Sequence, residues 1–577
     1  MARSKIWLYA AILITTTLCI YAHTARYGFI GWDDDKDVLN KPRIQQLTPA
    51  SVVHLFNPFG IFRGQYYYEY FPVTDLTYMI EWHFYGKDYP QGFHLDNVLL
   101  DMINVVLIFY AVGMLLRRAG LVEQAAAPAE ADSGTVQVTA FFTAMLFAVH
   151  PLMTENVAWL SGRKDLLLMM FLLLWFISFM KSSSLADAHQ EKNTAGGPAP
   201  AAKGMRTEQR GLSGQHSPGN SAILWYSISF ACFILAILSK FQGVIIPGVL
   251  AAYGLFINKN SWRSTLKKLL PYVVVLLVYV PYTLWYYHKG GTAFVDTKGV
   301  LWTFLFIPEA LFLYARKLVL PFDLAPVYTV PSLSDTGLIA ASLIFLVVLV
   351  IWIIRLFKKR DWLVLFGLSW FLANFIPVSN IIPLPTKMAD RYVYEGAFGV
   401  FLIAGSWASD LYRRTAKKQA AGVLFIAIAV MLAFLSYRQS LHWAKSSALW
   451  SYTLTLQPHS PVALNNIGVY YKNHGQPKTA EQEYKLALEY DDDFVPALWN
   501  LGMMYVDSGR YEEAFPLLKR MAGIKAPEQY MACRAVGALY LKFYNAPATA
   551  KKYFELSYRL NPHQPDVKTL KMLIDTL

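Results

Sequence analysis

Three consecutive aspartates follow the first apolar segment of this chain. They are Asp33, Asp34 and Asp35, within the stretch 28–37 that reads GFIGWDDDKD. Carboxylates beside a bilayer cost free energy unless they are solvated, paired or used in a reaction. A carboxylate held there can take a proton from a hydroxyl group and act as a general base. Asp34 and Asp33 are therefore the first candidates for a catalytic base, and a solvated loop without chemistry is the alternative.

Basic side chains lie close to the ends of other apolar segments. Arg163, Lys240 and Arg391 all occupy such positions. Guanidinium and ammonium groups bind phosphate and stabilise it as a leaving group, so these three cations predict a phosphate site. A structural Arg–Asp pair is the plainer interpretation of Arg163 with Asp165. Further polar candidates at the same level are His94, Asn97, His150, Glu155, Asp165, Asp390 and Tyr392.

A sugar linked to a lipid phosphate would use both kinds of residue. Its phosphate lies at the membrane surface, and its transfer needs one carboxylate base and cations that stabilise the departing phosphate. Aromatic residues in the first long loop, including Tyr66, Tyr67, Tyr68 and Tyr70, could stack on a sugar ring, although an interfacial aromatic belt is the commoner outcome. No glycine-rich phosphate loop and no hydrolase or zinc-protease motif occurs in the sequence.

The elements that must position these residues are membrane helices. The 577-residue chain is 55% apolar and only 16% charged, which is too apolar for an ordinary soluble protein. Its net charge of +13 comes from short basic clusters between apolar segments, which is typical of cytoplasmic loops and argues against a nucleic-acid partner. Three scattered cysteines indicate neither a disulfide framework nor a zinc site.

Eleven apolar segments are predicted to cross the membrane as helices. With eleven spans, every basic cluster falls on one side, which the positive-inside rule makes the cytoplasm. The segment 300–320 contains a proline and several charges, so we interpret it as an interfacial or re-entrant helix on the outer face. The predicted spans are 6–23, 94–116, 135–150, 163–181, 221–238, 241–257, 268–287, 337–357, 362–376, 392–409 and 420–437.

This topology divides the chain into a membrane domain, 1–440, and an outer domain, 441–577. The first extracytoplasmic loop is 24–93, and the stretch 184–220, rich in Ala, Gly, Ser and Pro, is predicted to be a flexible cytoplasmic linker. The first 25 residues also fit a signal peptide, but we favour a retained helix. Either choice leaves the acidic loop on the outer side.

A 34-residue period marks the C-terminal part. Gly468 and Gly502 are 34 residues apart, as are Gly475 and Gly509. This is the tetratricopeptide period, with small residues where paired helices touch. Two clear units open with ALNNIG and ALWNLG, and a looser third unit follows. Such arrays bury their core by stacking and offer a concave surface for a peptide or protein, so we expect 441–577 to bind an acceptor or partner protein.

Taken together, these motifs resemble the TMTC proteins, which are O-mannosyltransferases that combine membrane helices with tetratricopeptide repeats. Trp32-Asp33-Asp34 with Asn40 resembles their paired-acid motif, and the order of domains agrees. Relatives tend to carry Arg-Pro-Leu at Phe71-Pro72-Val73, so one expected cation is missing here. The other matching motifs are Phe93-His94…Asn97, His150-Pro151…Glu155…Gly162-Arg163…Asp165, Leu320-Pro321…Leu324 and Pro377-Val378-Ser379-Asn380…Asp390-Arg391-Tyr392…Tyr394.

The resemblance implies an all-α protein: a polytopic bundle of the GT-C glycosyltransferase type, followed by a tetratricopeptide α-solenoid. It also implies a polyprenyl- or dolichyl-phosphate-linked hexose donor, such as mannose, inverting transfer, and Ser or Thr of a protein as acceptor. By that match Asp33 or Asp34 is the base, and Arg163, Lys240 or Arg391 lies near the phosphate. No cofactor is implied, and a divalent metal at the acidic cluster stays open. The compact loops and short array favour a bacterial inner membrane, with the site and the repeats in the periplasm.

Two alternatives compete with this hypothesis. The first keeps the chemistry but uses a lipid or an envelope glycan as acceptor. The second is a non-catalytic, membrane-anchored scaffold whose repeats recruit partners. The scaffold predicts that deleting 448–577 abolishes function, whereas Asp33 and Asp34 are dispensable. A transporter is disfavoured because the polar residues gather at one face instead of lining a path across the bilayer.

Overall fold

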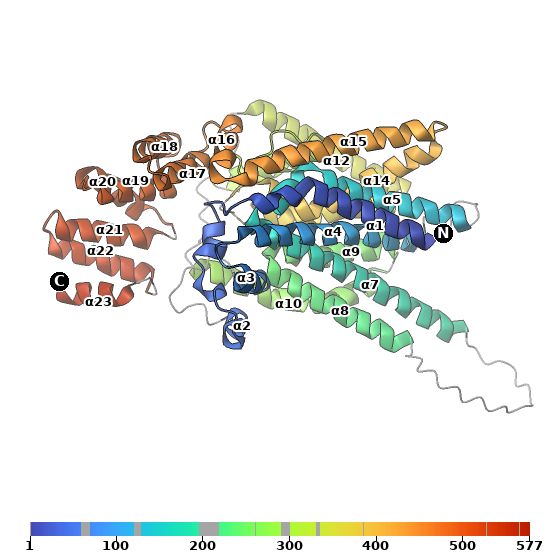
Figure 1. Cartoon of the computed structure of the whole chain (residues 1–577). Coiled ribbons are helices and arrows are strands. Elements are labelled where there is room, and N and C mark those ends of the chain that lie inside the picture. The colour runs from blue at the N-terminus through green and yellow to red at the C-terminus, as the bar shows by residue number, and fades with distance from the viewer. Residues whose placement is uncertain are drawn as a thin grey trace, which may run out of the picture.

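A computed structural model describes residues 2–58, 70–120, 129–195, 218–259, 261–289, 300–329, 335–382, 384, 386–526, 528–562, 564 and 566–577. Every regular element in these ranges is a helix. The helices form an elongated bundle, and an array of short helical pairs extends from one end of it (Figure 1). The predicted all-α class, a membrane bundle followed by a repeat solenoid, is confirmed.

The bundle packs its helices side by side around a continuous apolar core. Its closest packed pairs are α7 with α8, α5 with α14, α13 with α14, and α4 with α5. The helices are α1 (Ala2–Tyr21), α4 (Pro90–Arg118), α5 (Ala129–Val149), α7 (Arg163–Ala195), α8 (Pro218–Ser239), α9 (Ile246–Ala252), α10 (Trp262–Lys289), α11 (Val300–Val319), α12 (Thr336–Lys359), α13 (Trp362–Phe375), α14 (Tyr394–Arg414) and α15 (Lys418–Leu441).

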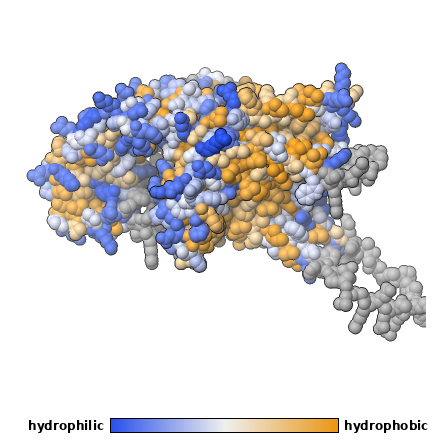
Figure 2. All heavy atoms as spheres, in the orientation of Figure 1, coloured by the Kyte–Doolittle hydropathy of each residue, from blue (hydrophilic) through white to orange (hydrophobic). Residues whose placement is uncertain are grey.

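Seven of the described helices are long and apolar enough to cross a membrane. There are eight if the bent pair Gly134–Val149 and Pro151–Ala158 is one span. The chain is therefore a multi-pass membrane protein, and Figure 2 shows the broad apolar band on its bundle. The predicted count of eleven is not confirmed. Residues 241–257 and 362–376 lie in shorter apolar helices, and α14, which holds 394–409 of the predicted span 392–409, is not in the set.

Part of the predicted linker 184–220 is helical. Residues 184–195 complete α7 and 218–220 begin α8, whereas 196–217 lie outside the described residues. The added turns of α7 contain good helix formers, and Asp187 pairs with Arg118 of α4. For 184–195 the linker prediction is thus corrected to helix.

The N-terminal helix α1 is an integral part of the bundle. Its residues Leu13, Ile20 and Tyr21 are buried in the apolar core, and it packs on α4, α5 and α15. Three of the four loop tyrosines singled out from the sequence, 66–68, lie outside the described residues. The fourth, Tyr70, packs against the rings of Tyr282 and Tyr286 on α10.

The repeats form where the 34-residue period places them. A Cβ added at Gly468 or Gly502 would lie 2.7 Å from Tyr484 or 2.8 Å from Leu518, so only glycine lets the paired helices approach this closely. The array helices are α16 (Ser446–Leu456), α17 (Pro461–Asn473), α18 (Pro477–Tyr490), α19 (Val495–Asp507), α20 (Tyr511–Gly523), α21 (Gln529–Lys542), α22 (Pro547–Leu560) and α23 (Val567–Thr576).

The array packs directly on the bundle. We call this end of the bundle the array face; it contains the start of α4 and α7 and the end of α8 and α15 (Figure 1). One buried cluster joins Trp159 of the bundle, Trp443 and Trp450 at the start of the array, and Ile467 of α17. The first repeat helices are therefore a wall of the array face and not a separate body on a tether.

Candidate active site

The acidic loop folds over the array face on a few short elements. These are η2 (Asp35–Leu39), α3 (Pro72–Tyr85), α6 (Thr154–Ala158) and η10 (Asp390–Val393), together with the first turn of α7. Because these elements come from distant parts of the chain, they bring its polar motifs together at one level of the bundle.

Asp34 is a fully buried carboxylate with both oxygens engaged. Its Oδ2 accepts from the Ile30 N–H at 2.9 Å, and its Oδ1 accepts from the backbone N–H of Ser161 at 3.2 Å and from its Oγ at 2.7 Å. Burial raises the pKa of Asp34 to about 7, although the hydrogen bonds from Ile30 and Ser161 oppose this shift. Asp34 therefore pins the acidic loop to the turn before α7.

Asp33 has a different environment from its neighbour. Its side chain is 30% exposed, and its nearest ion-pair partner among the described residues is Lys36, at 3.8 Å. Burial raises the pKa of Asp33, and the charges of Lys36, Lys164 and Arg391 lower it in part. Asp33 is thus an accessible carboxylate within the electrostatic reach of two cations that are held by other elements.

Arg391 acts electrostatically on this carboxylate and is surrounded by aromatic rings. Its Nη1 donates to Glu155 Oε1 at 2.7 Å, and its backbone N–H donates to Glu155 Oε2 at 3.0 Å. The guanidinium carbon lies 5.1 Å from the Trp32 ring, 5.3 Å from Trp159 and 5.1 Å from Tyr392. Within the described residues, Nε and Nη2 of Arg391 donate no hydrogen bond, so a guanidinium with donor capacity lies against Trp32 and within electrostatic reach of Asp33.

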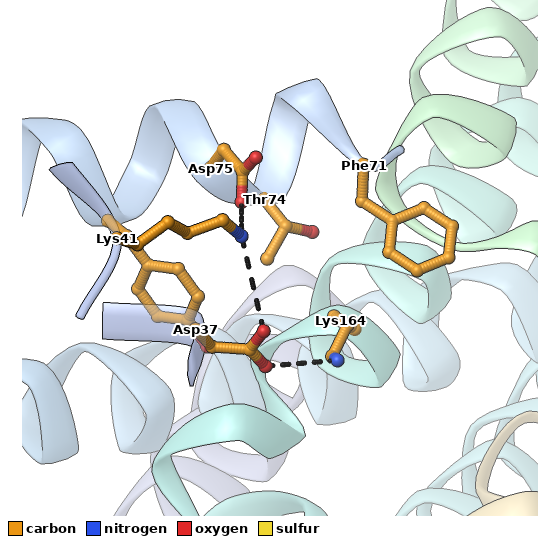
Figure 3. Close-up of a pocket in the computed structure, with 7 residues that line it drawn as sticks. Asp37, Lys41, Phe71, Thr74, Asp75 and Lys164 are labelled. Carbon is orange, nitrogen blue, oxygen red and sulfur yellow. Dashed lines mark hydrogen bonds and ion pairs between the residues drawn. The ribbon is translucent and has the colours of Figure 1, made fainter. Parts of the chain in front are cut away.

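A second cation group lines a small hollow of about 10 Å³ beside the acidic loop. Lys164 contacts Asp37 at 3.0 Å, and Lys41 bridges Asp37 at 4.0 Å and Asp75 at 2.5 Å. Figure 3 shows this alternation of charges, with Phe71 on the same hollow. Burial acts to raise the pKa of Asp37, but Lys164 and Lys41 outweigh it and hold that pKa below its usual range.

Phe71 stands where relatives of the resembled family tend to carry arginine. The hollow at Phe71 nevertheless holds two ammonium groups, those of Lys41 and Lys164, from other elements. Asp37 and Asp75 line the same hollow and pair with these lysines, so the two ammonium groups do not give the hollow a net positive charge in place of the missing arginine.

Arg163 does not have a free face for a phosphate. It is 1% exposed, and its Nε donates to Asn97 at 2.5 Å and its Nη2 to the Phe93 carbonyl at 2.7 Å. Its Nη1 pairs with Glu81 of α3. The predicted phosphate role of Arg163 is at odds with this geometry, because each nitrogen of the side chain serves the fold. We therefore leave it out of the candidate phosphate set.

Lys240 lies apart from the acidic loop. It pairs with Asp165, in the first turn of α7, and the buried Glu395 lies within its electrostatic reach. Asp165 does form an ion pair, as the plainer interpretation expected, but its partner is Lys240 and not Arg163. Lys240 keeps 13% of its side chain exposed and Arg391 11%, so exposure does not separate them; Lys240 is the weaker candidate because, unlike Arg391, it is not among the cations that lower the pKa of Asp33.

The other predicted polar residues mostly hold the backbone. His94 Nε2 lies 3.3 Å from the Gly28 carbonyl, and Asn97 donates to the Trp159 and Leu160 carbonyls. His150 Nδ1 accepts the Leu152 N–H at 3.3 Å where α5 ends.

Asp390 and Tyr392 flank Arg391 and hold the surrounding loops. The Tyr328 hydroxyl donates to Asp390 Oδ1 at 2.7 Å, and the Tyr392 hydroxyl donates to the Thr386 carbonyl at 2.9 Å. Burial raises the pKa of Asp390 to about 6, although Lys317 and Tyr328 lower it. These two residues therefore fix the segment that presents Arg391.

Several site residues were missed by sequence reasoning. Lys41, Lys164 and Asp75 line the hollow, and Glu81 neutralises Arg163. The four-residue spacing of Asp37 and Lys41 could have predicted their ion pair. The pairing of Arg163 with Glu81 joins residues 82 positions apart, so local sequence carries no sign of it.

The array contributes contacts to the acidic loop itself. The Gly31 N–H donates to Ser446 Oγ of α16 at 2.9 Å. Trp32 stacks on Trp159 at 4.7 Å and meets Trp450 of α16 edge-on at 5.3 Å. Two consecutive residues before Asp33 are thus held by the first array helix.

Metal ligation receives no support from the described residues. No group of three or more His, Cys, Asp or Glu side chains in those ranges converges as metal ligands do. The open suggestion of a divalent ion at the acidic cluster therefore stays out of the candidate site.

The fold and the site define a multi-pass membrane protein with an acid–cation site beside a tetratricopeptide array. Residues 461–494 and 497–524 each match the tetratricopeptide repeat family. The chain is also 23% identical to Protein O-mannosyl-transferase Tmtc3 of Drosophila melanogaster, over 88% of this chain and 57% of that protein.

Two further relatives show the same extent of similarity. Protein O-mannosyl-transferase TMTC4 of Mus musculus is 23% identical over 83% of this chain and 66% of that protein. Protein O-mannosyl-transferase TMTC1 of Homo sapiens is 23% identical over 86% of this chain and 57% of that protein. The resemblance to the TMTC proteins with their repeats is thus confirmed. The chain spans a little over half the length of the first relatives it matches.

Proposed function

We propose that this protein is an integral-membrane glycosyltransferase. It transfers a hexose, with mannose as the first candidate, from a polyprenyl-phosphate donor to Ser or Thr of extracytoplasmic proteins. The observation that carries the proposal is Asp33: a partly exposed carboxylate within electrostatic reach of the Arg391 guanidinium, which lies against the ring of Trp32. The names of the relatives, which are protein O-mannosyl-transferases, support the same reaction.

In the proposed reaction, Asp33 takes the proton of the acceptor hydroxyl as its oxygen attacks C1 of the sugar. The bond from C1 to the phosphate oxygen breaks, and its electron pair leaves with the polyprenyl phosphate. Attack opposite to the leaving group inverts the configuration at C1. Arg391, assisted by Lys164, stabilises the charge on the departing phosphate. The Trp32 indole offers an aromatic face to the sugar ring.

Asp34 is the weaker candidate for the base. All its described hydrogen bonds come from donors of the protein, so an acceptor hydroxyl would have to displace one of them. Asp33 has no such competition within the described residues. We therefore assign the base to Asp33 and a positioning role to Asp34.

The orientation and fold type are part of the proposal. Basic residues end α4, α12 and α14 at Arg117, Lys359 and Arg414, away from the array face. The positive-inside rule puts those ends in the cytoplasm, which leaves the site and the array outside. In a bacterial inner membrane that side is the periplasm. We infer a GT-C type enzyme with a membrane domain, 1–440, and an acceptor-binding repeat domain, 441–577.

A donor comparison tests the proposed function. Purified protein in vesicles receives radiolabelled mannose either on polyprenyl phosphate or on a nucleotide, together with an extract of extracytoplasmic proteins. We expect label in the protein fraction from the lipid donor only. Label in glycolipid instead would move the acceptor to a lipid or glycan. If folded protein transfers none of several hexoses, the glycosyltransferase proposal is wrong and a scaffold is the better account.

A further inference from the structure

A second hollow lies where α15 meets the array. It has a volume of about 170 Å³ and lies between the last turns of α15, the turn that follows α11, and Tyr452 of α16. The hollow is separate from Asp33 and the lysines of the acidic loop, which do not line it.

The lining combines apolar and polar side chains. Pro321 and Leu324 in its wall are buried or nearly so, and Phe322 is 53% exposed. Met431 and Phe434, which precede Arg438 on α15, are exposed along the apolar band. A bound ligand can therefore lay a hydrocarbon chain on α15 while its head occupies the hollow.

Two exposed charges of opposite sign line the hollow, Arg438 and Asp323. Neither forms an ion pair with any residue in the described ranges, and they do not pair with each other. The turn that carries Asp323 is fixed, because its carbonyl accepts from Lys317 Nζ at 2.7 Å and Gln439 Nε2 donates to the Leu324 carbonyl at 3.0 Å. The cation and the anion are thus presented by anchored elements and remain available to a ligand.

We propose that this hollow binds a zwitterionic phospholipid with a primary amine, of the phosphatidylethanolamine class. Its phosphate contacts Arg438, its ammonium donates to the Asp323 carboxylate, and its acyl chains lie on α15. An anionic lipid such as phosphatidylglycerol has no cationic group to offer to Asp323. A choline lipid has no N–H to donate to that carboxylate. The lipid would fill the junction between the bundle and the first array helix, and this role does not depend on the proposed transferase activity.

Native mass spectrometry of the full chain tests this assignment. The protein is delipidated, reloaded with equal amounts of phosphatidylethanolamine, phosphatidylglycerol and phosphatidylcholine, and the retained lipids are counted per folded molecule. We expect phosphatidylethanolamine to exceed each of the others by about fivefold, as one partly exposed charge contact provides. Arg438→Gln should reduce retention of both phosphatidylethanolamine and phosphatidylglycerol. Asp323→Asn should remove only the preference between them.

A matched control is Arg355→Gln, which removes an exposed cation from α12, outside this hollow, and should leave lipid retention unchanged. Both test positions are exposed, so we expect the variants to elute like the wild type. Equal retention of the three lipids by the wild type would overturn the proposal. The proposal would also be overturned if Arg438→Gln and Asp323→Asn both retained the lipids as the wild type does. Displacement of phosphatidylethanolamine by polyprenyl phosphate, dependent on Arg438, would also overturn it and assign the hollow to the donor lipid.

Discussion

At the residue scale, two adjacent aspartates have unlike surroundings. Asp34 is buried and accepts three hydrogen bonds, whereas Asp33 is partly exposed near Arg391. Adjacent residues on a turn point in different directions, so one can hold the loop while its neighbour faces the site. This division explains why the acidic cluster can be both a structural anchor and a candidate base.

Asp34→Asn should lower stability without removing a catalytic group. An amide in place of the carboxylate points an N–H₂ donor at a backbone N–H donor, either that of Ile30 or that of Ser161. The unsatisfied buried contact costs about 1–3 kcal/mol. Thermal unfolding in detergent measures this loss, with Asp35→Asn as the control on a less buried neighbour. Equal melting temperatures for Asp34→Asn and the wild type would contradict the anchoring role.

The pH profile should report Asp33. A general base acts only when it is deprotonated, so kcat/KM rises with pH through the pKa of the base. Burial raises the pKa of Asp33, and Lys164 lowers it in part. We expect the acid limb to lie above about 4, the ordinary value for Asp, and to move to higher pH in Lys164→Gln. If the acid limb of kcat/KM has the same pH position in Lys164→Gln as in the wild type, Asp33 is not the group that titrates.

Removal of Arg163 should lower the stability of the fold. Arg163→Ala leaves Glu81 as a buried, unpaired carboxylate, which costs about 3–5 kcal/mol of folding free energy. Replacing both partners, as in Arg163→Met with Glu81→Leu, should restore much of that loss. Thermal unfolding of the single and double variants checks this. A double variant that unfolds as early as Arg163→Ala would show that the ion pair is not the cause.

At the element scale, the repeats could be predicted from the sequence and the membrane helices only in part. The 34-residue spacing of Gly468 and Gly502 identifies the helix pairs, because each glycine faces a bulky side chain of the partner helix. Residues 241–257 are apolar enough to suggest a span, but Gly243 and Pro247 accompany a break into three short elements, η7 (Phe241–Ile245), α9 and η8 (Tyr253–Ile257). Hydropathy counts apolar residues and does not detect such breaks.

Helix α16 should order the acidic loop. Ser446 accepts the Gly31 N–H, and Trp450 packs on Trp32. We expect Ser446→Ala with Trp450→Ala to speed amide hydrogen exchange in 27–39 of the full-length chain, since both contacts restrain that segment. Ser508→Ala, in the second repeat, is a control distant from the loop. Unchanged exchange in 27–39 would mean that the loop is held by the bundle alone.

At the scale of the whole molecule, bundle and array meet through one buried cluster. It includes Trp159, Trp450 and Ile467, so α16 and α17 are part of the structural unit that holds the site. The later repeats contact other repeats and lie farther from the acidic loop (Figure 1). A truncation that tests the array must therefore keep α16 to α18.

Ending the chain after Tyr490 should separate acceptor binding from chemistry. The shortened protein keeps the contacts to Gly31 and Trp32, so we expect kcat for a short peptide acceptor to change by less than about threefold. For a folded protein acceptor, loss of the concave surface should raise KM by about tenfold, equivalent to roughly 1.4 kcal/mol of binding. Steady-state kinetics with both acceptors checks this. Equal losses for both would show that the removed repeats support the site itself.

The sequence could predict which residues belong to the candidate site, but not which residues they form hydrogen bonds and ion pairs with. The acidic loop and Arg391 were found because charged residues at membrane boundaries are costly. The partners of Arg163 come from helices that are distant in the chain, Glu81 on α3 and Asn97 on α4. Tertiary packing decided that this arginine is buried and that Arg391 keeps donors for a ligand.

The most direct test of the proposed chemistry compares Asp33→Asn with Asp35→Asn in the lipid-donor transfer assay. Asp35 belongs to the same acidic cluster, and its carboxylate has no hydrogen bond or ion pair within the described residues. We expect Asp33→Asn to lower kcat by about 100-fold or more, as loss of a general base does, and Asp35→Asn to keep near wild-type transfer. Full transfer by a well-folded Asp33→Asn protein would contradict the assignment of the base.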